Sequence, residues 1–528
     1  MLEKSLSGVS LKIRTMRNAL VPVNRLPVEV LQQIPSLLPY TFQIFTASQV
    51  CRYWRAAFLS HSELWTYLNC RSDRATRAMI ERSGVAPLNI VVNPGYSPDA
   101  FRYTIPHVRR WESLDVRAHR DEIGPVLATL TGPGSAPKLR NLSVVPMMGY
   151  DLESMLTLKG KILGGVLPSL RRICLCSIKF DIQKLTAPNL THLFLASTSS
   201  EFINMTALLG FLERSPLIED FELRYPGPGL PDLAHPDHTV SLPRLRHIVL
   251  WDQSSMYLHH LTLPHGVESE FNFLFTDVSA TEGFLEEMFA ILPDAPSPIY
   301  EAESMSIVPH YDRGVVRFIG PSGVVEIFPT FSHGERTPIT RFIVYPPSVL
   351  TNVKELFVCS RDGMIPGWES ADVMRHLKKM TSLKSLTIMQ CNARSFIQAL
   401  LPTEGEVPCP TLENLTIHLA HFETLCIPHF ESMVERRGHH GHKFNKIVLI
   451  LHHVSPESLD IPNLEVKVDH RPLHWDSTKK IWRYLSEGEG YLENHGSRTL
   501  ATPGIMPLED DMLPALLSDV MRSMNIHV

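Results

Sequence analysis

A short apolar spacing recurs ten times along the chain and constrains the fold more than any other feature. Each copy has an apolar residue, two unrestricted positions, a second apolar residue, one unrestricted position and a third apolar residue. Alternating apolar residues over so short a stretch are typical of a β-strand that buries one face. The copies begin at Trp111, Leu139, Leu170, Leu190, Ile218, Leu245, Val353, Leu383, Leu412 and Phe444.

The copies return with a nearly constant period. Their starts lie about 20 to 32 residues apart, except for the longer gap between Leu245 and Val353. Three of the intervening segments, residues 204–216, 370–380 and 429–438, place apolar residues at helical intervals. One strand and one helix per period predict an α/β solenoid, shaped as a horseshoe, with a parallel concave sheet and outer helices over residues 71–470.

The period is lost in two places. Residues 258–350 combine an amphipathic helix at 281–292 with strand-like segments joined by Asp-Arg-Gly and Pro-Ser-Gly turns. We interpret them as degenerate repeats with a hairpin-like elaboration. The chain from 471 to 528 has no repeat, and its apolar residues near 513–524 predict a final helix, which would cap the solenoid or belong to a mobile tail.

The region before the repeats is expected to be helical. The segment "NRLPVEVLQQIPSLLP" begins with Asn24 as a candidate helix cap and continues with apolar residues at helical spacing. The segment "SQVCRYWRAAFL" at 48–59 predicts one helix that places Cys51, Trp54 and Phe58 on its buried face. A packed cysteine is favoured over a nucleophilic one, because an activated thiol needs a partly exposed site with a nearby base.

These helices carry more apolar surface than they can bury. Three short helices within about fifty residues form too small an interior for all their large side chains. The segment "HSELWTYL" adds Leu64, Trp65 and Leu68 to the same region. The surplus apolar face therefore predicts a partner.

Three blocks of this region resemble the F-box family: "LPVEVL" at 26–31, "SQVCRYWR" at 48–55 and Leu64-Trp65. The resemblance covers residues 23–70 and implies a small helical bundle that docks onto the Skp adaptor of an SCF (Skp–cullin–F-box) ubiquitin ligase. Pro35 departs from the family, which usually has a bulky residue there, and is expected to end the first helix early. The resemblance assigns the docking surface to Leu26, Pro27, Val30, Leu31, Ile34, Val50, Cys51 and Trp54.

The repeats also resemble a known class, the irregular leucine-rich repeats that follow an F-box, especially in expanded fungal families. In such a solenoid, residues between the buried positions project from the concave sheet. Trp251 and the nearby Arg224 have the composition of an interface anchor; alternatively, these positions are ordinary solvated residues, with Trp251 covered by a loop. Candidate target-binding residues are Phe194, Glu222, Arg224, His247, Trp251 and Phe357, with His192, Asp220, Val249, Glu355, Thr387, Asn414, Thr416 and His418 on the same face.

Composition and missing motifs exclude several classes of function. The chain has 50 Lys+Arg and 55 Asp+Glu, a net charge of −5, so no general field attracts nucleic acid or an anionic membrane. Its eight cysteines form no CxxC pair, which favours a reducing compartment, cytoplasmic or nuclear. Residues 1–22 are expected to be a mobile extension rather than a targeting signal. No apolar run has membrane-spanning length.

The sequence favours a protein without catalysis, cofactor or metal. It has no phosphate-binding glycine loop, no HExxH and no Gly-x-Ser-x-Gly motif. The histidines at 439, 440, 442, 452 and 453 lack a carboxylate or thiolate partner in sequence and are a weak metal signal. The leading hypothesis is a substrate receptor of an SCF ligase. The alternatives are a repeat-based interaction or scaffold protein with a degenerate F-box and, more remotely, an enzyme within 258–350.

Overall fold

The structure is a computed structural model of the 528-residue chain. The chain divides into two compact units, which meet in sequence between Ile218 and Glu219. Unit 1 contains residues 1–149 and 154–218, and unit 2 contains 219–226 and 230–528, with short exchanges at 150–153 and 227–229. The residues that the structure describes are 9–10, 12–14, 16–18, 20–34, 42–147, 156–196, 205–224, 239–251, 260–264, 266–275, 301–309, 314–321, 323–331, 350–359, 370–389, 393–403, 406–419, 427–451, 464–468, 473–476 and 481–484.

All ten copies of the apolar spacing are β-strands. Every one of their thirty pattern residues is buried, with at most 4% of its surface exposed. The prediction of one strand per copy is therefore confirmed. The strands are β3 (Trp111–Val116), β4 (Asn141–Val144), β6 (Arg172–Cys176), β8 (His192–Ala196), β9 (Asp220–Arg224), β11 (His247–Trp251), β17 (Glu355–Cys359), β18 (Ser385–Met389), β19 (Asn414–Leu419) and β20 (Lys446–Leu451).

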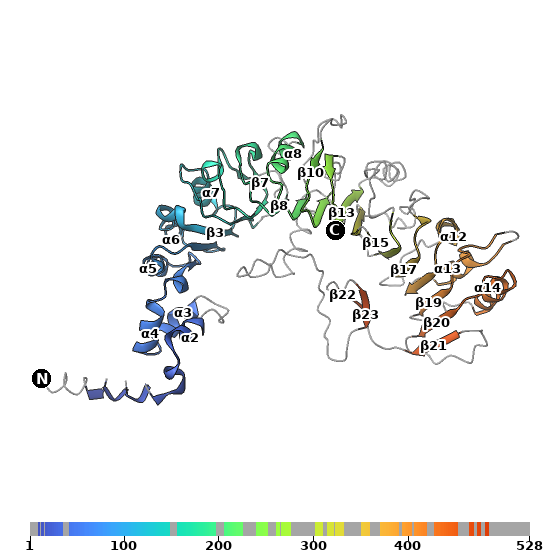
Figure 1. The fold of residues 1–528 in the computed structure, drawn as a ribbon, viewed down its shortest axis with the longest axis horizontal. Coiled ribbons are helices and arrows are strands. Elements are labelled where there is room, and N and C mark those ends of the chain that lie inside the picture. The colour runs from blue at the N-terminus through green and yellow to red at the C-terminus, as the bar shows by residue number, and fades with distance from the viewer. Residues whose placement is uncertain are drawn as a thin grey trace. The chain divides into compact units, whose positions relative to one another are not determined.

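Unit 1 contains a parallel sheet of six strands in the order β1 (Tyr67–Leu68), β2 (Leu88–Val92), β3, β4, β6 and β8. The register aligns equivalent positions of the repeat, so that Leu114, Leu142, Ile173 and Leu193 face one another in turn. These aligned side chains form a continuous apolar row, which is how each repeat buries the face that it could not bury alone. Helices α7 (Gly124–Leu130) and α8 (Met205–Glu213) lie on one face of this sheet (Figure 1).

Unit 2 contains a series of eleven paired strands, most of which run parallel to their neighbours. Its strand order is β9, β11, β13 (Val267–Phe275), β16 (Gly323–Phe331), β15 (Gly314–Gly320), β14 (Ser304–Pro309), β17, β18, β19, β20 and β21 (Leu464–Val468). Among the described pairings of these strands, β14–β15 and β15–β16 are antiparallel and the others are parallel. Helices α12 (Ser370–Lys379), α13 (Ala393–Leu400) and α14 (Ile427–His439) belong to the same unit.

The hairpin-like elaboration is confirmed for residues 304–331, where β14, β15 and β16 run back and forth and remain part of the main sheet. Gly323 in the Pro-Ser-Gly turn has a positive φ of 139°, and a Cβ there would lie 2.5 Å from the Val267 carbonyl oxygen. Only glycine fits this turn beside β13 without displacing backbone. The helix expected at 281–292 lies outside the described residues.

Helices do not follow every strand, and this part of the prediction is wrong. Among the described residues, the connections after β4 and β6 contain the short 3-10 turns η6 (Ile162–Gly164) and η7 (Ile182–Lys184) and no α-helix. The interval between β6 and β8 is too short for a full helix together with the connecting turn before it and the one after it. Short parallel pairs occupy the outer layer there and further on, namely β5 (Leu156–Thr157) with β7 (Ile178–Lys179) and β10 (Val240–Ser241) with β12 (Leu261–Thr262).

The C-terminal region contains one described hairpin, β22 (Leu473–Asp476) with β23 (Ile481–Tyr484). The final helix expected near 513–524 lies outside the described residues. Across the described ranges, none of the helices combines the length and apolar character needed to cross a bilayer.

A buried arginine connects consecutive repeats of unit 2. Arg437 in α14 has no exposed surface, and its guanidinium donates to the carbonyl oxygens of Pro408 at 2.6 Å and Cys409 at 2.8 Å. The guanidinium also lies 5.0 Å from the ring centroid of Phe444. Cys409 in turn donates from its thiol to the Leu377 carbonyl oxygen of α12 at 3.1 Å. We call this set of contacts the Arg437 brace, since it joins α14 to the loop before β19 and that loop to α12.

Two buried cysteines should resist alkylation in the folded chain. Cys70 and Cys409 are 0% and 1% exposed, and burial raises the pKa of each thiol to about 12. Because the thiolate is the reactive form, we expect iodoacetamide at pH 8 to leave both residues unmodified while it labels the half-buried Cys51. Peptide mass spectrometry before and after urea unfolding checks this. Labelling of Cys409 in the native chain at the rate found in urea would contradict its burial.

Candidate functional site

The N-terminal helical domain consists of five short elements: η1 (Pro22–Arg25), α2 (Val28–Gln33), α3 (Phe42–Ser48), α4 (Arg52–Leu59) and η3 (Ser62–Trp65). Asn24 does not cap a helix, so that expectation is wrong. The residue before α2 is Pro27, whose fixed φ suits a helix start. The Asn24 side chain instead accepts a hydrogen bond from the Trp54 indole nitrogen at 2.6 Å, which ties η1 to α4.

The segment 48–59 is two elements rather than one helix. α3 ends at Ser48, and Cys51 is extended, with φ −157° and ψ 174°, immediately before α4. The Arg55 guanidinium donates from Nε to the Ser48 carbonyl oxygen at 3.1 Å and holds the break. Cys51 is therefore half-buried at the start of α4, which corrects its predicted place within a buried helical face.

Aromatic residues form the interior of the domain. Leu31, Phe58 and Trp65 have no exposed surface. The Trp65 ring meets Phe45 edge-on at 5.3 Å between centroids, and Trp54 meets Phe58 in the same way at 5.6 Å. Edge-to-face pairs of this kind stabilise a small interior beyond the area that they bury.

The helical domain shares its interior with the first strands of unit 1. The Trp65 indole nitrogen donates to the Phe58 carbonyl oxygen at 2.9 Å, and the guanidinium of Arg82 in α5 (Asp73–Ser83) lies 4.4 Å from the Trp65 ring centroid. Three residues after Trp65, Leu68 is already a fully buried member of β1, which pairs with β2. The domain therefore continues into the sheet without a flexible linker.

Exposed apolar side chains concentrate in the N-terminal part of the chain. Of eleven large apolar residues that are exposed among the described residues, nine lie between residues 9 and 59. Within the helical domain they are Val30 (41% exposed), Val50 (58%), Tyr53 (41%) and Leu59 (42%). Arg52 and Arg55 are exposed beside them on α4. Several exposed large apolar side chains within one small domain point to a protein-interaction surface.

The structure separates the eight residues assigned by resemblance into three groups. Leu31 is in the core, so it supports the surface rather than forming it. Leu26, Ile34, Cys51 and Trp54 are half-buried, and Pro27, Val30 and Val50 are exposed. Pro35 lies outside the described residues, and α2 ends at Gln33, two residues before it.

Two exposed residues, Tyr53 and Leu59, were not among those expected. Tyr53 donates from its hydroxyl to the Leu26 carbonyl oxygen at 2.9 Å, which joins α4 to the segment before α2. The sequence could have indicated both residues, because they are large apolar residues of α4 that lie outside the stripe formed by Trp54 and Phe58.

Several residues expected on the concave sheet of unit 2 are in contact with one another. Arg224 forms an ion pair with Glu222, and its guanidinium lies 4.1 Å from the ring centroid of Trp251. Asp220 and His247 face each other across β9 and β11, with 3.8 Å between Oδ1 and Nδ1. Trp251 is only 5% exposed, so the Arg224 contact belongs to a nearly buried stack. A role of these residues in target binding stays a prediction.

The remaining candidates follow the sheet register. Phe357, Thr387 and Thr416 are consecutive neighbours across β17, β18 and β19, and all three are half-buried. Asn414, one strand position before Leu415, is also half-buried, whereas His418 is 7% exposed and Val249 is 1% exposed. In unit 1, His192 and Phe194 of β8 are half-buried. Glu355 at the start of β17 is exposed.

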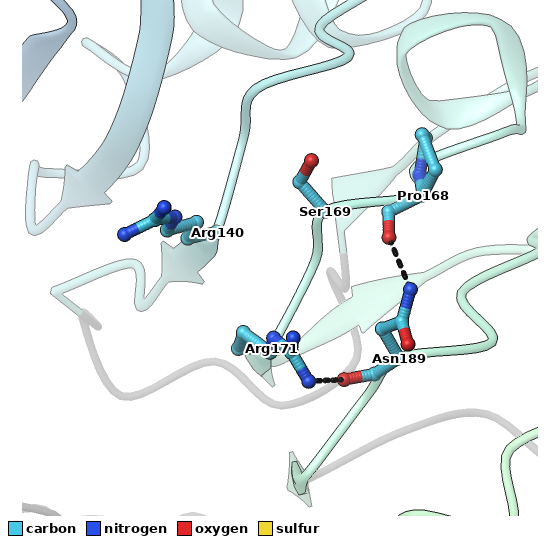
Figure 2. Close-up of a pocket in the computed structure, with 5 residues that line it drawn as sticks. All are labelled: Arg140, Pro168, Ser169, Arg171 and Asn189. Carbon is cyan, nitrogen blue, oxygen red and sulfur yellow. Dashed lines mark hydrogen bonds between the residues drawn. The ribbon is translucent and has the colours of Figure 1, made fainter.

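One surface pocket of unit 1 lies at the starts of β4, β6 and β8. Its volume is about 400 Å³, and Figure 2 shows the five residues that line it. Arg171 donates to the Asn189 carbonyl oxygen at 3.3 Å, and the Asn189 amide donates to the Pro168 carbonyl oxygen at 2.8 Å. Arg140 forms an ion pair with Glu112 at 3.3 Å. The lining side chains are thus held mainly by neighbouring backbone, and none was a sequence candidate.

Two of the histidines at the end of α14 and in the loop after it contact other residues of this chain. His442 contacts the Pro410 carbonyl oxygen through Nδ1 at 2.8 Å, and exposed His439 lies 3.5 Å from Glu435. His452 and His453 lie outside the described residues. In the part of the chain that the structure describes, no group of three or more His, Cys, Asp or Glu side chains could hold a metal ion.

Comparison with known families gives one match. The family model described as F-box-like matches residues 23–71, which is the helical domain together with the start of the sheet. No curated protein matches the chain. The match covers about a tenth of the sequence and supports an F-box protein at its N-terminal end, followed by a mixed α/β region with large, mostly parallel sheets.

Proposed function

We propose that this chain is a substrate-recognition subunit of an SCF-type ubiquitin ligase. Residues 23–71 would dock onto the Skp adaptor, and through it onto a cullin, while the sheets behind them bind a target protein. The chain would contribute position rather than chemistry, because holding a target beside a transferred ubiquitin raises the effective concentration of its lysines. We further propose that it works in the cytoplasm or nucleus.

One observation carries this proposal: the matched domain leaves Val30, Val50, Tyr53 and Leu59 exposed, whereas among the described residues after Leu59 only two large apolar side chains, Val85 and Val166, are exposed. Exposing such side chains to water is unfavourable by roughly 1.5–3 kcal/mol each relative to full burial. A domain that retains four of them on α2, α4 and the turn between α3 and α4 is suited to a stable partner.

The sheets support the second half of the proposal less directly. Their strands repeat with the spacing of irregular leucine-rich repeats, to which we assign them, and the residues between the buried positions include aromatic, charged and hydroxyl groups. A mixed surface of this kind fits a folded protein or an extended peptide better than a small apolar ligand. The target would contact candidates such as Phe194, Phe357 and the Arg224–Trp251 stack.

Substitution of the exposed valines should abolish adaptor binding without unfolding the domain. We expect Val30→Asp and Val50→Asp each to lower recovery of the purified Skp adaptor by at least about tenfold, because each places a charge in the centre of an apolar contact. The measurement is co-purification of the full chain with the adaptor, followed by titration. Leu26→Ala/Pro27→Ala should weaken capture as well, because half-buried Leu26 and exposed Pro27 belong to the same assigned surface.

Val85→Asp is the matched control. Val85 is 89% exposed, carries the same side chain and follows α5 outside the four exposed docking residues. It should bind the adaptor as the unmodified chain does. If the unmodified chain recovers no adaptor, the ligase role is lost, and the scaffold alternative with a degenerate F-box takes its place.

A further inference from the structure

A second apolar surface lies before the F-box-like domain. Residues 9–20 are helical at every position that the structure describes, and Val9, Ile13, Met16 and Leu20 are 56%, 61%, 71% and 68% exposed. These residues are four, three and four positions apart, the spacing of the d and a positions of a coiled-coil heptad. In the sequence the same spacing occurs further back at Leu6 and Leu2. We call Val9, Ile13, Met16 and Leu20 the N-terminal seam.

The seam is separate from the interior of the F-box-like domain. Among the described residues, the helix is attached near its end, where Asn18 accepts hydrogen bonds through its carbonyl oxygen from the Val21 backbone at 3.2 Å and the Asn24 side chain at 2.7 Å. Asn24 is in turn bonded to Trp54. The exposed fractions show that the described residues of the chain leave the seam uncovered, so its side chains are available to another molecule.

The charges beside the seam decide which pairing is possible. Lys12 occupies a g position and Arg17 an e position, and the described residues between 9 and 20 include no acidic side chain. In a parallel pair of identical helices, g faces e, so Lys12 would meet Arg17 of the partner subunit twice. This repulsion disfavours the parallel arrangement.

An antiparallel pair avoids the conflict, because e then faces e and g faces g. The register that sets Ile13 against Met16 of the partner subunit also sets Val9 against Leu20 of the partner subunit. In this register Arg17 lies opposite Ser10 of the partner subunit. Lys12 lies opposite Ala19 of the partner subunit. All eight apolar side chains are paired and no like charges meet, so the seam is complementary to itself.

We propose that residues 9–20 form an antiparallel two-helix coiled coil with the same segment of a second copy of this chain. The helices are short, and helices of fewer than about 12–15 residues are marginal alone, so formation of the pair and folding of the segment are expected to be coupled. The dimer should accordingly be weak, with a dissociation constant on the order of 10 μM. The proposal does not depend on the ligase role.

The test is the mass of the purified full chain in solution, measured by sedimentation velocity over a range of concentrations around the expected dissociation constant. The unmodified chain should change from monomer to dimer. Ile13→Asp and Met16→Asp should each weaken the dimer at least about tenfold, since each buries a charge in the seam. Arg14→Asp introduces the same side chain on the outside of the helix and should leave the dimer intact.

One more variant tests the orientation. Lys12→Glu would face Arg17 of the partner subunit in a parallel pair and strengthen it markedly, whereas in the antiparallel pair it faces alanine and the dissociation constant should change by less than about threefold. A chain that stays monomeric throughout, or a dimer that survives both aspartate variants, overturns the proposal. A dimer strengthened by Lys12→Glu overturns the antiparallel arrangement. Adaptor capture, measured on the same variants, should be unchanged.

Discussion

Trp65→Ala is expected to destabilise the helical domain by about 3–5 kcal/mol, the usual cost of removing a large aromatic side chain from a core. The indole has no exposed surface, meets Phe45 edge-on, lies beneath Arg82 and donates to the Phe58 carbonyl oxygen. Its loss would leave a cavity where α3, α4 and α5 meet. Because the domain exposes its docking residues through these same helices, adaptor capture should fall together with stability.

Hydrogen–deuterium exchange locates the effect of the substitution. Amides of α4 and η3 should exchange roughly a hundredfold faster or more in Trp65→Ala, since each 1.4 kcal/mol of lost local stability is a factor of ten in exchange. Trp65→Phe keeps one aromatic ring but removes the hydrogen bond and part of the buried indole, so it should cost less than Trp65→Ala, about 1–3 kcal/mol. Equal exchange in the two variants would show that the hydrogen bond, not the packing, holds the domain.

Arg437→Ala should destabilise the repeats of unit 2 by a similar amount, about 3–5 kcal/mol. The substitution removes the donors of two buried carbonyl groups, at Pro408 and Cys409, and leaving a buried acceptor unpaired costs about 1–3 kcal/mol each. It also removes the packing of the guanidinium against Phe444. Burial lowers the pKa of Arg437, but an arginine remains protonated at neutral pH, so the two hydrogen bonds are charge-assisted.

Arg436→Ala is the control for this experiment. Arg436 is the preceding residue of α14 and is exposed, so its removal should change stability by no more than about 0.5 kcal/mol. Arg437→Lys retains a charge but cannot donate to both carbonyls in a planar fork, so it should resemble alanine more than arginine. Hydrogen–deuterium exchange of the backbone amides in α13, β19 and α14 compares the three variants. If these amides exchange no faster in Arg437→Ala than in the unmodified chain, the structural role of the Arg437 brace is disproved.

The strands were predictable because their signal is local. Three apolar side chains at fixed spacing define each strand, and all thirty are buried. β2 was not among the predicted strands, although Val85, Leu88 and Ile90 have the same spacing and Leu88, Ile90 and Val92 alternate as strand residues do. It differs from the ten copies in that its first pattern residue, Val85, is exposed. The connections were less predictable: α7 lies between β3 and β4, whereas the interval between β6 and β8 contains β7 and η7.

The docking surface was predictable as a surplus of apolar residues, but not residue by residue. No glycine or proline marks the break between α3 and α4, so periodicity continued a single helix through Cys51 and placed it on the wrong surface. The exposure of Trp251 in the sheet was likewise not predictable from the spacing of its own strand. Whether an interleaved residue is open or nearly buried depends on a neighbour from another strand, here Arg224, which the spacing of a single strand cannot reveal.

The direct passage from Trp65 into β1 has a consequence for how the gene can change. Side chains alternate along a strand, so one residue inserted or deleted between Trp65 and Leu68 would turn Leu68 out of the core and move Tyr67 into its place. Insertions or deletions between Trp65 and Leu68 should therefore be tolerated only when they change the length by two residues, which keeps Leu68 on the buried face. The number of residues between the helical domain and the first strand is therefore fixed. Replacing either part with a homologous module would succeed only if the residues from Trp65 to Leu68 were replaced with it.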